Sequence, residues 1–361
     1  MRCVSWYKPG MCLCRRVPGL RALAAAVLLF GPLPGFCRGA VDIAPVSRTE
    51  VGLLGTACTI TVYGGGAEQA LAAAFKRIEE INGKMTVHGT DSEVIEVNRA
   101  SGVKPVRVSP DTFAVIARGL EFARLTDGAF DITVGPLVKL WGIGTSAARV
   151  PSTRDIRDAV ARIGWRDVAL SSKESTVFLK RPGMALDLGA IAKGYAADEA
   201  SRTLREHGIA NALINLGGNV LTVGAKPDGT PWRIGAQDPE QPRGTHIGIV
   251  ETGPAAVVTS GSYEQYFEED GKRYHHILDT RTGFPVSNGL SAVTIVTADS
   301  TTADGYSTLV FALGLQKGRA LVESSGGVIE ALFITDRREI YLTAGLKKKF
   351  RLTNSQFTLR E

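Results

Sequence analysis

The segment at residues 187–198 constrains this chain more than any other, because it combines a carboxylate, a glycine turn, a lysine and a helix start. It reads Asp-Leu-Gly-Ala-Ile-Ala-Lys-Gly-Tyr-Ala-Ala-Asp. The apolar residues at 184–188 predict a short strand. Gly189 then turns the chain into a helix that runs to about His207, before the stop signal at Gly208. Backbone N–H groups at a helix N-terminus attract anions, and carboxylate oxygens attract Mg²⁺. The segment can therefore hold a phosphate and a metal together.

The order of the predicted elements indicates an α+β protein with mixed sheets and packed helices, in one large domain that could have two lobes. Strands come in runs as well as in alternation with helices, which is not the pattern of a doubly wound sheet. Of the 361 residues, 44% are hydrophobic, enough for a substantial core. Helices are expected at 68–81, 92–98, 109–125, 152–163, 302–313 and 317–324. The folded domain is expected at 46–345, followed by a C-terminal tail at 346–361.

Residues 1–40 have the features of an export signal. A positive region that includes Arg15 and Arg16 precedes an apolar run at 20–30, which is too short for a stable transmembrane helix. Two alternatives stay open for processing: lipid modification at Cys37, or ordinary cleavage near residues 39–40. We therefore expect an exported, periplasmic protein that is either free or anchored to the membrane as a lipoprotein. Four of the five cysteines lie in this signal, and Cys58 is expected to be a core residue.

Asp304 and Thr308 lie four residues apart on a predicted helix, so their side chains share one face. The polar residues at 300–302 mark the helix start, which places Asp304 near the first turn. One interpretation is that Asp304 only compensates the helix dipole and that Thr308 is a surface hydroxyl. The other is that these oxygens, with a backbone carbonyl and water, form a site for a hard cation.

His275 and His276 lie in a predicted short strand, just before a rigid turn at 279–283. Adjacent strand residues point to opposite faces, so at most one of the two can face a site. A histidine beside a fixed loop suits general base catalysis near neutral pH. The ordinary alternative is one surface histidine and one buried, hydrogen-bonded histidine.

Several functions are not indicated by the sequence. The net charge of +6 is mild and no basic helix is interleaved with aromatic residues, so we expect no nucleic-acid partner. No serine lies in a Gly-x-Ser-x-Gly context, and no Gly-x-Gly-x-x-Gly follows a strand, which argues against a hydrolase elbow and a Rossmann site. Asp187 could simply cap the following helix, and Lys193 could simply be solvated.

Taken together, seven motifs in this order resemble the ApbE family of FAD:protein FMN transferases, from about residue 52 to residue 343. The motifs lie at 85–98, 128–133, 187–195, 215–219, 259–263, 275–283 and 303–308. Family members are exported or lipid-anchored bacterial proteins that bind FAD with Mg²⁺. They cleave its pyrophosphate, release AMP and attach FMN to a Thr or Ser of a flavoprotein subunit in a membrane electron-transfer complex.

The resemblance implies a role for each matching residue. His276 would be the catalytic base, and Asp304 would be catalytic through the metal. The metal would be held by the backbone oxygen of Ala190 together with Asp304 and Thr308. The residues implied to line the FAD site are Met85, Ala129, Phe130, Asp131, Asp187, Lys193 and Ile277.

Three hypotheses for function follow from these residues. The first is a flavin transferase with Mg²⁺ as cofactor and FAD as substrate, associated with the inner membrane through its acceptor or an anchor. The second is an FAD pyrophosphatase that gives FMN and AMP, with water in place of the protein hydroxyl. The third is an exported protein that binds FAD without turnover. The presence of Asp304, Thr308 and His276 favours the first two.

Overall fold

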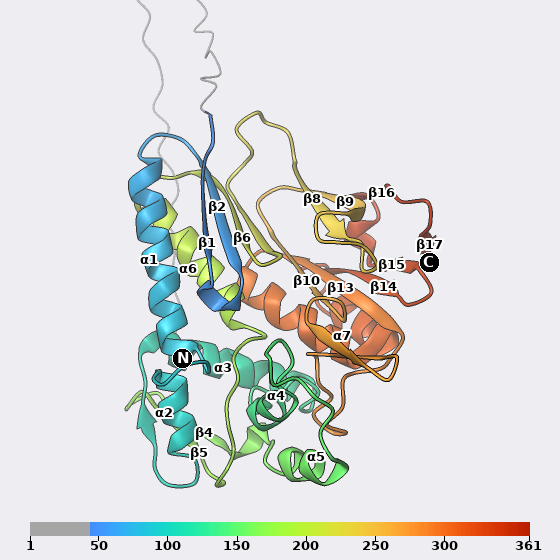
Figure 1. Ribbon diagram of the computed structural model, residues 1–361. Coiled ribbons are helices and arrows are strands. Elements are labelled where there is room, and N and C mark those ends of the chain that lie inside the picture. The colour runs from blue at the N-terminus through green and yellow to red at the C-terminus, as the bar shows by residue number, and fades with distance from the viewer. Residues whose placement is uncertain (1–43) are drawn as a thin grey trace, which may run out of the picture. The chain divides into compact units, whose positions relative to one another are not determined.

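The computed structural model describes residues 44–361, drawn in colour in Figure 1. The predicted export signal at 1–40, including Cys37, lies outside the described residues. Among residues 44–361, no helix combines the length and the apolar character that a bilayer crossing needs.

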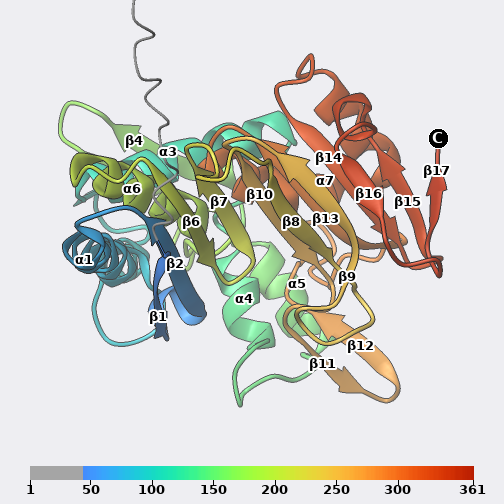
Figure 2. The ribbon, with the colours of Figure 1, turned by 90° about the horizontal axis from the view of Figure 1, so that it is seen from above.

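A nine-stranded sheet forms the centre of the domain, in the order β1-β2-β6-β7-β10-β13-β14-β15-β17. Its strands are β1 Val46–Val51, β2 Ala57–Tyr63, β6 Asn211–Leu216, β7 Asn219–Val223, β10 Ala256–Gly261, β13 Leu290–Thr297, β14 Glu330–Thr335, β15 Glu339–Leu342 and β17 Thr358–Arg360. Neighbouring strands are antiparallel, except for the parallel pair β15 and β17. Figure 2 shows β6, β7, β10, β13, β14 and β15 following one another across the sheet.

Three helices cover one face of this sheet: α1 (Ala67–Met85), α6 (Ala192–Glu206) and α7 (Ser300–Glu323). The alternation of side chains in β2 explains the packing, because Cys58, Ile60 and Val62 are fully buried in the same apolar cluster as the inner faces of α1 and α6. The expected core position of Cys58 is therefore confirmed, and burial raises the pKa of its thiol to about 11.

A small sheet covers the other face, with strand order β16-β9-β8. It consists of β8 (Trp232–Gln237), β9 (His246–Thr252) and β16 (Phe350–Leu352). Neighbouring residues of β10 separate the two layers, because Val258 belongs to the helical cluster and Val257 to the cluster beneath the small sheet. Residues 346–361, expected as a tail, contribute β16 and β17 to the two sheets and so continue the folded domain.

The remaining elements lie mostly below α1 and α6 in Figure 1, apart from two 3₁₀ turns at 53–55 and 344–346, which lie in connections between sheet strands. They are α2 Glu93–Arg99, α3 Pro110–Leu125, α4 Gly135–Trp141, α5 Thr153–Val160, β3 Val106–Arg107, β4 Val168–Ser171, β5 Thr176–Leu179, the hairpin β11 Tyr266–Glu269 with β12 Lys272–His275, and the 3₁₀ turns Leu53–Gly55, Trp165–Asp167 and Ala344–Leu346. The predicted α+β class and the predicted helices are confirmed. The helices expected at 302–313 and 317–324 form the single element α7, which kinks at Gly314 (φ 79°).

The strand expected at 184–188 is wrong. Only Ala185 forms a bridge, to Val134. The side chain of Asn98 takes the place of a strand partner at Leu186. It accepts a hydrogen bond from the N–H of Leu186 at 2.6 Å and donates one to the carbonyl of Leu186 at 3.0 Å. The extended backbone is therefore satisfied without a ladder, and its apolar side chains are still buried.

Candidate active site

A cavity of about 410 Å³ opens where the C-terminal end of α1, the start of α6, the end of β10 and the middle of α7 approach one another. It is lined by ten of the eleven residues assigned to a site from the sequence, namely Met85, Ala129, Phe130, Asp131, Asp187, Ala190, Lys193, His276, Ile277 and Thr308. The eleventh, Asp304, is buried directly behind Lys193. Residues that are more than 200 positions apart in sequence, such as Met85 and Thr308, thus meet at one place.

The start of α6 is joined directly to α7 through Asp304. The backbone N–H of Gly194 donates to Asp304 Oδ2 at 2.8 Å. Lys193 Nζ lies 3.4 Å from Asp304 Oδ1 and donates to the carbonyl of Gly189 at 2.9 Å. A Cβ at position 194 would collide with the backbone oxygen of Ser300, so only glycine permits this approach of the two helices.

A second carboxylate, Asp198 of α6, fixes the N-terminus of α7. Its oxygens accept from the N–H groups of Ser300 and Thr301, each at 2.8 Å, and from Thr301 Oγ1 at 2.6 Å. Burial raises the pKa of Asp198. Asp299 completes the cap by accepting from Thr302 N at 2.8 Å. Asp198 and Asp299 together cap the N-terminus of α7. The carboxylate of Asp304 does not serve as a cap and instead accepts a hydrogen bond from α6.

Several hard oxygen donors lie beside this contact between α6 and α7. Thr308 lines the cavity one turn after Asp304, and its Oγ1 lies 3.2 Å from Ser260 Oγ. Asp304 Oδ1 faces the ammonium of Lys193, and the carbonyl-bearing turn at Ala190 lines the same wall. Within residues 44–361, no cluster of three or more His, Cys, Asp or Glu could hold a metal. One carboxylate with a hydroxyl, a carbonyl and waters suits Mg²⁺, which keeps several waters in protein sites.

The two histidines have different surroundings, as expected from their adjacency. His275 is buried, its Nε2 lies 2.9 Å from the carbonyl of Val286, and burial lowers its pKa. His276 lines the cavity, and its Nδ1 lies 3.2 Å from the carbonyl of Gln265. A carbonyl only accepts, so Nδ1 carries the proton and Nε2 keeps a free lone pair. Burial chiefly lowers the pKa of His276 to about 4, so the ring is neutral at pH 7 and able to accept a proton.

The two aspartates at the cavity wall shape the loops that carry them. Asp187 Oδ1 accepts from Gly189 N at 2.8 Å, which holds the turn before α6, and burial raises its pKa. It does not cap α6, because the N-cap residue is Ile191 and no side chain fills that role. Asp131 accepts from Thr133 N at 2.8 Å and Trp165 N at 2.9 Å; burial is the main cause of its raised pKa.

Aromatic packing fixes the wall that contains Phe130. The Phe122 ring of α3 makes edge contacts with Phe130 at 5.8 Å and with Tyr306 at 5.7 Å between ring centroids. A Cβ at position 305 would overlap the Phe122 ring, which explains the glycine there. Tyr306 is thus turned toward α3.

Sequence reasoning missed several side chains that line the cavity from loops. They are His88, Arg243, Glu264, Gln265 and Thr280. Arg243, between β8 and β9, forms an ion pair with Glu264, between β10 and β11. His88 and Thr280 lie inside the motifs at 85–98 and 275–283, which was the available signal. Nothing in the sequence around Arg243 pointed to the cavity.

Comparison with known proteins places this geometry in a family. The sequence model of the ApbE family matches residues 54–333. The chain belongs to the ApbE family. An FAD:protein FMN transferase of Klebsiella pneumoniae is 41% identical over 299 residues, covering 82% of this chain and 92% of the relative. The enzyme of the same name from Treponema pallidum is 35% identical over 342 residues, covering 90% of this chain and 94% of the relative.

Solved ApbE structures share the fold. The ApbE protein of Thermotoga maritima superposes with a TM-score of 0.79 at 34% identity, covering 85% of this chain and all of that one. The flavin transferase ApbE of Vibrio cholerae gives a TM-score of 0.75 at 30% identity, again covering 85% of this chain and all of that one. The predicted ApbE resemblance and its fold class are therefore confirmed.

Proposed function

We propose that the cavity binds FAD beside a Mg²⁺ ion, and that the acceptor of its FMN is a Thr or Ser hydroxyl of an exported or membrane flavoprotein. The chain is an FAD:protein FMN transferase of the ApbE family, since relatives of that name match most of its length. One observation carries the assignment of the chemistry. Lys193, the turn before α6 and the neutral His276 face a single cavity, and Asp304 lies buried directly behind Lys193.

The start of α6 is the proposed site of the pyrophosphate. Lys193, at the N-terminus of α6, lines the cavity and provides positive potential there. Asp304, Thr308 and the carbonyl of Ala190 would hold Mg²⁺. When bound, Mg²⁺ would neutralise negative charge on the pyrophosphate of FAD. Phosphoryl transfer needs such charge neutralisation more than it needs covalent catalysis. Asp198 and Gly194 keep α6 and α7 close enough for this arrangement.

His276 is the proposed general base. Its Nε2 takes the proton of the acceptor hydroxyl as the hydroxyl oxygen forms a bond to the phosphorus of the FMN half. The bond between that phosphorus and the bridging oxygen breaks, and AMP leaves with the electron pair. The hydrogen bond from Nδ1 to Gln265 keeps the ring in the required tautomer. A positioned base of this kind typically contributes about 10²–10⁴ in rate.

The remaining assigned residues would contact the rest of FAD. Met85, Phe130 and Ile277 are buried apolar side chains at the wall, and Ala129 leaves room beside them. Asp131 and Asp187 would act mainly through the loops they hold, because their oxygens already accept backbone hydrogen bonds.

The direct test combines the mature domain with FAD, Mg²⁺ and a recombinant flavin-acceptor domain. A mass gain on the acceptor equal to one FMN residue, with one AMP released per label, supports the proposal. AMP and free FMN without labelling would identify a pyrophosphatase. FAD that stays intact and bound would identify a storage protein.

We also propose that residues 1–40 direct export, so that the domain works in the periplasm beside an acceptor subunit of a membrane electron-transfer complex. A lipid anchor in the inner membrane would require lipid modification at Cys37. Fractionation of cells that express the full chain and its Cys37→Ala variant tests both points. A chain that stays in the cytoplasm contradicts export, and an unchanged membrane fraction in the variant contradicts the anchor.

A further inference from the structure

A second pocket of about 480 Å³ adjoins the FAD cavity along α7. Ala129 and Ala312 line both spaces, so the wall between the pockets carries single methyl groups at these positions. The rest of the wall is formed by two loops that a hydrogen bond and an ion pair hold together. Thr280 Oγ1 donates to the carbonyl of Gly128 at 2.6 Å, and Arg281 lies 3.6 Å from Asp127.

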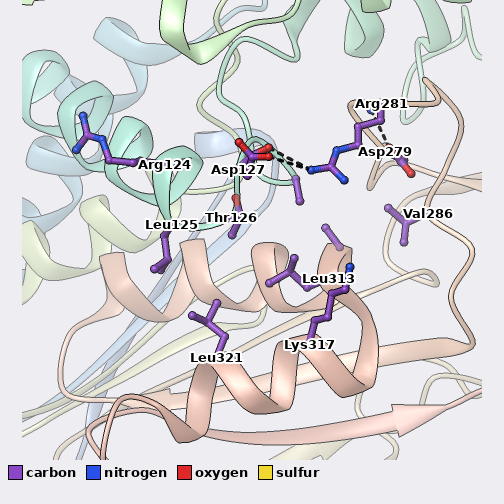
Figure 3. Close-up of a pocket in the computed structure, with 12 residues that line it drawn as sticks. Arg124, Leu125, Thr126, Asp127, Asp279, Arg281, Val286, Leu313, Lys317 and Leu321 are labelled. Atoms are coloured by element: carbon purple, nitrogen blue, oxygen red, sulfur yellow. Dashed lines mark hydrogen bonds and ion pairs between the residues drawn. The ribbon is translucent and has the colours of Figure 1, made fainter.

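The second pocket pairs an apolar floor with cationic groups. Leu313 and Leu321 of α7 form the floor; Val286 faces it from a loop, and Leu125 faces it from the C-terminal end of α3 (Figure 3). Lys317 extends from α7 on the side where Val286 and Arg281 lie (Figure 3). Asp127 is already paired with Arg166 at 2.7 Å as well as with Arg281.

Among the cations that line this pocket, Lys317 has no carboxylate partner within residues 44–361, whereas Arg281 is paired with Asp127 and Arg124 lies over the Trp165 ring. Lys317 therefore places one unpaired positive charge next to the apolar floor, while the carboxylate of Asp279 is held by the N–H groups of Arg281 and Thr282. A ligand with one apolar side chain and one carboxylate complements it.

We propose that this second pocket docks the polypeptide that flanks the acceptor hydroxyl, through an apolar and an acidic side chain of the acceptor. The inference rests on the proposed transfer to a protein hydroxyl. An acceptor that places its hydroxyl between His276 and Thr308 must lead its chain out of the cavity. The five helical steps from Thr308 to Leu313 span about 7.5 Å, which is the reach of two to three extended residues. The residues that dock are therefore within a few positions of the modified Thr or Ser.

The test measures acceptor labelling by Lys317→Glu, with Lys348→Glu as a matched control. Both lysines are exposed and neither forms an ion pair within residues 44–361, but Lys348 lies near the C-terminus, outside both pockets. The probe is a flavin-acceptor domain that the wild-type protein labels. Losing one exposed ion pair weakens binding by roughly 1.4- to 5-fold, and reversal of the charge adds a repulsion of similar size. We expect the KM for the acceptor domain to rise roughly 2- to 25-fold in Lys317→Glu, with kcat and the dissociation constant for FAD unchanged.

Each other outcome overturns the inference in a distinct way. Equal KM values for Lys317→Glu and Lys348→Glu would show that the pocket does not dock the acceptor. A change in FAD affinity with an unchanged acceptor KM would show that the pocket belongs to the FAD site. A salt titration adds a second criterion, because the acceptor KM of the wild type should rise with ionic strength more steeply than that of Lys317→Glu. Wild-type protein that labels no acceptor while it hydrolyses FAD contradicts the proposed function itself.

Discussion

Replacement of Asp198 by alanine should weaken both the fold and the metal site, because this one carboxylate ties α6 to α7. The substitution leaves three donors without their acceptor: Ser300 N, Thr301 N and Thr301 Oγ1. Ser300 is fully buried, so its N–H cannot turn to water, and a buried unpaired donor costs about 1–3 kcal/mol. Thr301 is only half-buried, and water can replace part of its loss.

A compensating effect reduces this cost. Burial raises the pKa of Asp198, so the folded protein spends free energy to keep the carboxylate charged, and alanine removes that penalty. We therefore expect the free energy of unfolding to fall by about 2–4 kcal/mol. The Mg²⁺ concentration that gives half-maximal labelling should rise, because Asp304 is one turn further along α7.

Asp299→Ala is the matched control for this prediction. Asp299 caps the same helix through a single bond to Thr302 N and is exposed, so its loss should cost about 1 kcal/mol and leave the Mg²⁺ dependence unchanged. Urea unfolding followed by circular dichroism gives the stabilities, and labelling at varied Mg²⁺ gives the dependence. If Asp198→Ala and Asp299→Ala had the same stability and the same Mg²⁺ dependence, the hydrogen bonds between Asp198 of α6 and the start of α7 would have no functional role.

Two further predictions concern the base and the helix contact. The acidic limb of kcat/KM should lie near pH 4, because the pKa of His276 is lowered to about 4 and the ring stays neutral above that value; a limb near pH 6.5 that disappears in His276→Ala would contradict this. The same shift implies that the contribution of His276 to stability is complete above pH 6.5 and is lost as the pH falls toward 4. Gly194→Ala should abolish labelling because its Cβ meets Ser300 and Asp304, whereas Gly83→Ala in α1 has open space and should be neutral or slightly stabilising; equal activity of the two variants would refute the contact.

Local signals in the sequence were sufficient for most of the helices, although α4 (Gly135–Trp141) was not predicted. Ser92 and Ser152 accept from backbone N–H groups three residues ahead, as such positions do at helix starts. Local geometry also explains why Asp304 and Thr308 share one helix face, and why His275 and His276 have different surroundings.

Features that depend on distant partners could not be predicted. The strand expected at 184–188 is replaced by side-chain bonds from Asn98, and a strand pattern alone does not reveal such a partner. No local pattern indicates the role of Asp198, because its carboxylate oxygens accept hydrogen bonds from another helix about a hundred positions away. Arg243 reaches the cavity only because the small sheet packs against the central one.

The most direct test of the central claim is the Mg²⁺ titration of FMN transfer by Asp304→Asn. The asparagine oxygen can still accept the hydrogen bond from Gly194 N, so the fold is retained while the negative charge beside Lys193 is removed. We predict that FAD still binds and that labelling of the acceptor domain is lost at every Mg²⁺ concentration at which the wild type is active. Labelling by Asp304→Asn with the wild-type rate and Mg²⁺ requirement would show that this carboxylate does not hold the metal, and would contradict the account.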